Sequence, residues 1–175
     1  MAANDTDALF AQFDHDDENT RLRAGLEVGY LEDDVVPRLV ALLGDPRPRV
    51  RATAAYALGH MASAVQSLIA DLADPEQGNE VVLEPHEELR IKKVPPTLAA
   101  VRALFESDPD GDVRSAAFKA MMFYDEVQRD PGRYADLAVA ALDSDDAGLR
   151  HAAAFAVRRF EPKSERAARA LGRVL

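Results

Sequence analysis

One short pattern recurs along this chain of 175 residues, and the repetition constrains the fold more than any other feature. The pattern is an Asp, a short stretch that ends in Val or Leu, and then an Arg. Its four copies are Asp45–Arg51 (DPRPRVR), Asp108–Arg114 (DPDGDVR), Asp17–Arg23 (DENTRLR) and Asp143–Arg150 (DSDDAGLR). A regular recurrence of this kind predicts an array of similar structural units.

Each copy lies between two segments that have the composition of helices. An amphipathic segment precedes the Asp, as in VVPRLVALL, and a segment rich in small residues follows the Arg, as in RATAAYALGH. The Asp can cap the second helix, and a Pro in the turn ends the first. The Arg carries five donors in a fixed fork, so it can bond to neighbouring turns and form a ladder along the stack.

The pattern therefore predicts an all-α solenoid of about five stacked helical hairpins, folded as a single domain over residues 1–175. The expected helices lie near 5–13, 18–31, 33–43, 47–61, 63–73, 95–107, 112–124, 133–142, 146–160 and 163–174. The last of these has no partner helix, and we expect it to cap the stack.

The repeated residues resemble HEAT repeats, in particular the short bacterial kind also found in phycobilisome lyase subunits. The shared motif is D-P-x-x-x-V-R-x-x-A-A-x-A-L-G. Residues 45–59 match it almost throughout, 108–122 and 143–157 match in part, and 17–31 matches weakly. The resemblance implies a right-handed superhelix whose second helices line a concave binding face.

Residues 74–94 interrupt the repeat. The Asp residues that begin the four copies are 28, 63 and 35 positions apart in chain order. The interval of 63 has room for one further unit. Its first helix is expected at 63–73, but the stretch that follows has β-type composition and ends at Pro95-Pro96. The segment is either a loop or short hairpin that covers the core, or a binding insertion at the rim of the concave face. Its candidate functional residues are Glu84, His86, Glu87 and Glu88.

Aligning the second helices on their Arg predicts which side chains face a partner. In each second helix, the positions five and nine after the Arg share one helix face. Across neighbouring units these positions line up as two columns of side chains. The predicted partner-binding residues are Tyr56, His60, Lys119, Phe123, Phe155 and Arg159, with Val28 as the first-unit equivalent of Tyr56. Aromatic residues with Arg are typical of interaction surfaces, although the two Phe residues could instead fill space between units. The predicted buried set is Val50, Ala54, Ala57 and Leu58.

No complete catalytic or metal-binding motif is present. The chain has no Cys, its four His residues are not paired at helical spacing, and the Asp-rich turns at 108–112 and 143–146 lack the terminal Glu of a calcium loop. His86 among its neighbouring Glu residues is the best metal candidate, but a solvated charged turn is the favoured interpretation. We therefore expect no cofactor, no metal and no catalytic residue.

The charge limits the choice of partner. The formal net charge is −10, which argues against a nucleic-acid partner.

No signal peptide or membrane span is recognisable, so we expect a cytoplasmic location and no membrane partner. Residues 1–34 carry ten acidic and two basic side chains, and residues 150–175 carry seven basic and two acidic ones. These ends predict a monomer with weak head-to-tail self-association at low salt.

Two functions remain open from the sequence. The first is a non-catalytic scaffold that binds a protein or peptide on the concave face. The alternative is an accessory or catalytic subunit resembling bilin lyases, which act on a tetrapyrrole and a carrier protein.

Overall fold

Helices account for all the regular secondary structure in the part of the chain that the computed structural model describes, namely residues 3–31, 34–73, 83–124, 131–160 and 172. In chain order the helices are α1 (Ala3–Ala11), α2 (Glu18–Gly29), α3 (Val36–Leu42), α4 (Pro48–Ala73), α5 (Pro85–Lys93), α6 (Leu98–Ser107), α7 (Gly111–Met121), α9 (Pro131–Ala141) and α10 (Ala147–Phe160). Short 3₁₀ turns at Gln12–Asp14 and Pro95–Thr97 follow α1 and precede α6.

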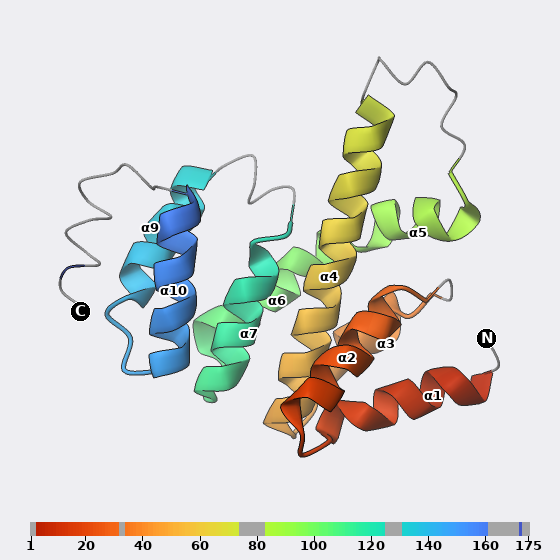
Figure 1. Cartoon of the computed structure of the whole chain (residues 1–175), viewed down its shortest axis with the longest axis horizontal. Helices are drawn as coiled ribbons and strands as arrows, with labels where there is room; N and C mark the ends of the chain where they lie inside the picture. Colours follow the sequence, from red (N-terminus) through yellow and green to blue (C-terminus); the bar gives the residue numbers. More distant parts are fainter. Residues whose placement is uncertain (1–2, 32–33, 74–82, 125–130, 161–171, 173–175) are drawn as a thin grey trace.

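The helices form hairpins stacked in two layers, as the repeat predicts. The hairpins are α1–α2, α3–α4, α6–α7 and α9–α10, and the second helices α2, α4, α7 and α10 pack against one another in sequence (Figure 1). The chain is thus an all-α helical repeat solenoid, and the expected fold class is confirmed. The layer of second helices is the one that carries the predicted binding columns.

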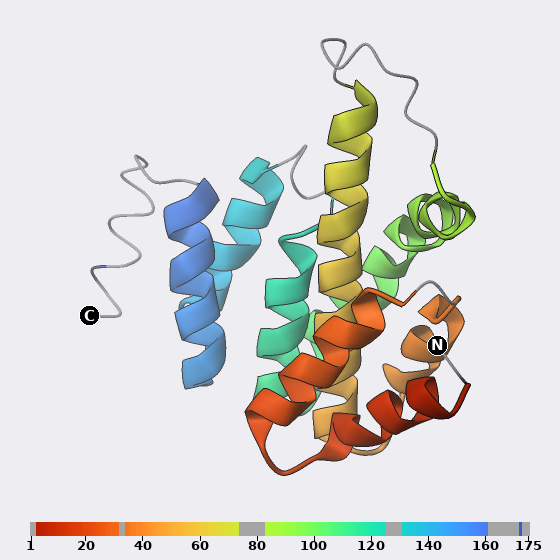
Figure 2. The ribbon, with the colours of Figure 1, turned by 45° about the vertical axis from the view of Figure 1, so that its right-hand side comes forward.

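One expected boundary is wrong, because α4 runs without interruption from Pro48 to Ala73 where two helices, 47–61 and 63–73, were expected. The stretch after His60 contains neither Pro nor Gly, so nothing in it ends a helix. Met61, Ala62 and Val65 are buried, which holds this stretch in the core. The second half of α4 extends past the neighbouring helices (Figure 1 and Figure 2).

The irregular segment expected at 74–94 is also partly wrong. Residues 74–82 lie outside the described residues, but Pro85–Lys93 form helix α5. Pro85 occupies the first turn, and the Glu87 carboxylate accepts a hydrogen bond from the Glu84 backbone N–H at 2.9 Å. Acidic residues in the first turn and basic ones in the last complement the helix dipole. These terminal signals outweigh the β-type composition of the segment.

Two basic side chains hold α5 against the loop between α2 and α3. The buried Arg90 donates to the Leu31 carbonyl oxygen, and Lys93 pairs with Asp34. Helix α5 also packs on α4. Helix α5 is thus attached both to the loop before α3 and to α4.

Small residues let the second helices approach closely, and the predicted buried set is confirmed. Val50, Ala54, Ala57 and Leu58 are at most 2% exposed. At Gly59, an added Cβ would lie 2.8 Å from the Cα of Ala120, so α4 and α7 touch at a point where only glycine fits. One continuous apolar core runs through the described helices from Phe10 to Val157.

None of the described helices combines the length and the apolar character needed to cross a membrane. The expected capping helix at 163–174 lies outside the described residues, apart from Gly172.

Candidate functional site

The same two hydrogen bonds recur at the turn before each second helix. An Arg guanidinium donates from one nitrogen to the backbone carbonyls five and six positions earlier. The donors and acceptors are Arg21 to His15 (2.7 Å) and Asp16 (2.9 Å), Arg51 to Asp45 (2.8 Å) and Pro46 (3.1 Å), Arg114 to Asp108 (2.8 Å) and Pro109 (3.1 Å), and Arg150 to Ser144 (2.8 Å) and Asp145 (2.9 Å). These four turns are called the joints below. The Arg closes each turn on itself and fixes the direction in which the helix leaves it.

A side-chain acceptor six positions before the Arg completes each joint by accepting the backbone N–H two residues later. The acceptors are His15 Nδ1 for Asp17 (3.0 Å), Asp45 for Arg47 (2.9 Å), Asp108 for Asp110 (3.0 Å) and Ser144 Oγ for Asp146 (3.2 Å). An imidazole nitrogen and a hydroxyl thus replace the carboxylate in the first and last joints.

This geometry corrects the predicted joint residues of the first and last units. The Arg of the first joint is Arg21, whereas Arg23 lies exposed beside Glu27, 3.8 Å from its carboxylate. Asp17 caps α2 by accepting the Thr20 N–H at 2.8 Å. In the last joint the acceptor is Ser144, and Asp143 is exposed. Matching the Asp residues by type shifted the alignment, because the acceptor in these two units is not an Asp.

The predicted Arg ladder is present at one place in the described part of the chain. Arg51 donates to both carboxylate oxygens of Asp108, at 2.8 and 2.9 Å, and so connects the joint before α4 to the joint before α7. Burial raises the pKa of Asp108, but the hydrogen bonds and charge of Arg51 outweigh it and leave that pKa below its ordinary value.

With the joints aligned on Arg21, three positions of each second helix face the same side: one, five and nine after the Arg. The sets are Leu22, Ala52, Ser115 and His151; then Leu26, Tyr56, Lys119 and Phe155; then Tyr30, His60, Phe123 and Arg159. Val28 is fully buried and does not belong to this face. Tyr30, which the sequence alignment missed, is 67% exposed at the end of α2. The side chain of Arg159 lies outside the described part of the structure.

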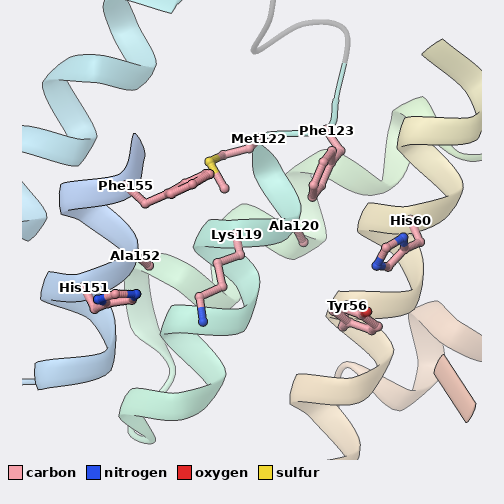
Figure 3. A pocket seen from close by; sticks show the side chains of 9 residues that line it. All are labelled: Tyr56, His60, Lys119, Ala120, Met122, Phe123, His151, Ala152 and Phe155. Atoms are coloured by element: carbon pink, nitrogen blue, oxygen red, sulfur yellow. The ribbon is translucent and has the colours of Figure 1, made fainter. Parts of the chain in front are cut away.

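A pocket of about 340 Å³ opens on this face between α4, α7 and α10 (Figure 3). Tyr56 and His60 of α4, Lys119, Ala120, Met122 and Phe123 of α7 and its following turn, and His151, Ala152 and Phe155 of α10 line it. Five of the six predicted partner-binding residues therefore meet in one hollow, called the aromatic pocket below. His151 is four positions before Phe155, so helical spacing alone could have indicated it.

The aromatic side chains of the pocket contact one another in a row. The Tyr56 and His60 rings meet edge to face with centroids 4.4 Å apart, and His60 lies nearly parallel to Phe123 at 6.1 Å. Phe155 is 46% exposed, so it does not simply fill space between units, and Phe123 is half-buried. Burial lowers the pKa of His60 and, together with nearby Tyr30, raises that of Tyr56. The row therefore lines one side of the pocket with neutral, largely apolar rings.

Two further hollows continue along the same layer toward α2. One, of about 330 Å³, shares Tyr56 and Lys119 with the aromatic pocket and adds Leu22, Ala52 and Ser115, among others. The next, of about 350 Å³, shares Arg21, Ala52 and Asp112 with the second and extends to Arg47 and Arg49. We call these three linked hollows the groove.

The residues predicted for the insertion lie elsewhere. Glu84, His86, Glu87 and Glu88 form the start of α5, and none of them lines the described groove. Among the described residues, no group of three or more acidic, His or Cys side chains is placed to hold a metal ion.

Residues 6–82 match the family model for HEAT repeats, and no curated protein matches the chain. The matched segment covers the first two hairpins from residue 6 onward, and the match supports their assignment to HEAT repeats. The joints at Asp108–Arg114 and Ser144–Arg150 repeat the same hydrogen bonds beyond it.

Proposed function

We propose that the chain is a non-catalytic scaffold that binds a segment of another protein in the groove. The observation that carries the proposal is the aromatic pocket, in which three successive units contribute Tyr56, His60, Phe123 and Phe155 to one open hollow. Aromatic side chains in a hollow are the usual anchors of protein interfaces.

The repeat architecture supports the same conclusion. HEAT repeats commonly act as protein-interaction scaffolds, and solenoids of stacked hairpins present extended surfaces to their partners. In this chain the groove follows the layer of second helices across α2, α4, α7 and α10. A partner lying in it would contact several repeats at once.

Quantitative capture of partners from cell extract tests the proposal with Phe155→Ala. Truncating an aromatic anchor costs about 2 kcal/mol or more of binding, about thirtyfold in affinity. Because Phe155 is half exposed, its loss should leave the fold intact, as circular dichroism can verify. Val40→Ala is the matched control, because Val40 is 37% exposed on α3 in the other layer. Equal capture by the two variants would refute binding in the groove.

The bilin-lyase alternative is tested separately by absorbance titration with a free bilin. Its support is the resemblance in the repeat motif, and no contact in the described residues adds to it. A spectral change that Phe155→Ala abolishes would favour that alternative over a protein-binding groove.

A further inference from the structure

Basic side chains gather at the aromatic pocket although the chain as a whole is acidic. Lys119 projects from α7 and His151 from α10, and both are exposed (Figure 3). The guanidinium carbon of Arg158 lies 5.8 Å from the centroid of the Phe155 ring. No acidic side chain lines this pocket.

Lys119 and His151 differ from the groove residues Arg21, Arg47 and Arg49, whose guanidinium groups are already bonded. Arg21 donates to the backbone carbonyls of its own joint. Arg47 pairs with Asp45 and Asp14, and Arg49 pairs with Asp16. Lys119 and His151, in contrast, form no hydrogen bond or ion pair with any described residue. The ammonium group of Lys119 and the ring nitrogens of His151 are therefore available to a bound molecule.

We propose that the groove selects a peptide segment in which a large apolar side chain lies next to an Asp or Glu. The apolar side chain enters between Phe155, Met122 and Phe123, and the neighbouring carboxylate lies against Lys119 and His151. This inference rests on the proposed function and names the chemistry of the partner.

The shape and charge of the groove favour a peptide over other ligands. The aromatic pocket continues into the second hollow through Tyr56 and Lys119, so the site is elongated rather than enclosed. An extended chain can follow such a path and place successive side chains in each hollow. The second hollow also contains Glu18 and Asp112, which disfavour a polyanion such as a nucleic acid along its length.

Three pools of fluorescein-labelled synthetic peptides test the inference with the full chain. All three hold the same apolar and aromatic centre, and they differ only in flanks of Glu, Ser or Lys. We expect the Glu-flanked pool to bind about fivefold more tightly than the Ser-flanked pool at low salt, the range of one or two exposed charge pairs. The preference should shrink as salt is added.

Lys119→Glu provides the decisive comparison. It should abolish or reverse the preference for Glu flanks, while Lys92→Glu, an exposed lysine of α5 outside the groove, should leave it unchanged. Phe155→Ala should weaken the binding of all three pools.

Other outcomes separate this inference from the function it rests on. Equal binding of the three pools, weakened alike by Phe155→Ala, overturns the charge selection and leaves a peptide-binding groove standing. Preference for Lys flanks also overturns it. Failure of every pool to bind overturns the inference, and capture of a protein that depends on Phe155 would then still uphold the scaffold.

Discussion

Arg51 and Asp108 form a bidentate ion pair between residues 57 positions apart, with N–O distances of 2.8 and 2.9 Å. The side chain of Arg51 is 12% exposed and that of Asp108 is 4% exposed. The pair connects two joints and therefore sets the spacing between α4 and α7, the helices that form one side of the aromatic pocket. Its loss should affect both the stability of the stack and the shape of the groove.

Replacing Asp108 with Asn should lower the free energy of unfolding by about 2–4 kcal/mol, because it leaves the partly buried Arg51 without its counter-charge. The amide oxygen can still accept the Asp110 N–H, so the joint itself is retained. Asp143→Asn is the control, since Asp143 is exposed, and it should change stability by less than about 0.5 kcal/mol. Urea denaturation followed by circular dichroism measures both variants. Equal free energies of unfolding for the two variants would show that the ion pair between Arg51 and Asp108 contributes nothing to stability.

Two buried helical glycines should respond to alanine in opposite directions. At Gly59 a Cβ would lie 2.8 Å from the Ala120 Cα, and the overpacking cost of about 1–3 kcal/mol should exceed the gain in helix propensity of about 1 kcal/mol. At Gly29 the nearest atoms to a Cβ are 3.7 Å away, so only the gain applies. Thermal unfolding should therefore show a lower melting temperature for Gly59→Ala and a higher one for Gly29→Ala. A stabilised Gly59→Ala variant would contradict the close contact between α4 and α7.

Acid should destabilise the stack through the carboxylates of the joints. Hydrogen bonds from Arg47 lower the pKa of Asp45 to about 2, and the pKa of Asp108 is also below its ordinary value. A carboxyl whose pKa is lower in the folded state stabilises the fold above its unfolded pKa of about 4 and loses that contribution as pH falls toward 2. Unfolding measured between pH about 5 and 2 should show this loss, and Asp45→Asn/Asp108→Asn should flatten it. An identical pH profile for the double variant would assign the acid sensitivity to other groups.

The joints of the second and third units could be predicted from the sequence because both carry an Asp six positions before the Arg. In the first and last units the same acceptor is His15 or Ser144, so alignment by residue type chose Asp17 and Asp143 instead. That shift hid Tyr30 and brought Val28 into the wrong column. Hydrogen bonding, rather than residue identity, defines the register.

The remaining differences between the predicted and the observed helices concern where helices begin and end. The absence of any breaking residue after His60 implied a continuous α4, but the expectation of a regular hairpin outweighed that signal. In α5 the Glu84-Pro85 start and the basic last turn predict a helix. The β-branched residues nearby instead favoured a loop or short hairpin. The pocket residues were predictable because helical spacing fixes which positions share a face, whereas the depth of the hollow depends on packing between units.

Site-specific photo-crosslinking tests the central claim, that a partner lies in the groove, most directly. A photoreactive phenylalanine analogue placed at Phe155 replaces one exposed aromatic ring with another, and the same analogue at Val40 reports on the layer formed by α3. The account predicts that, in cells, the probe at position 155 crosslinks to a protein partner in good yield and that the probe at position 40 does not. Crosslinking that is equal at the two positions, or found at position 40 alone, would contradict it.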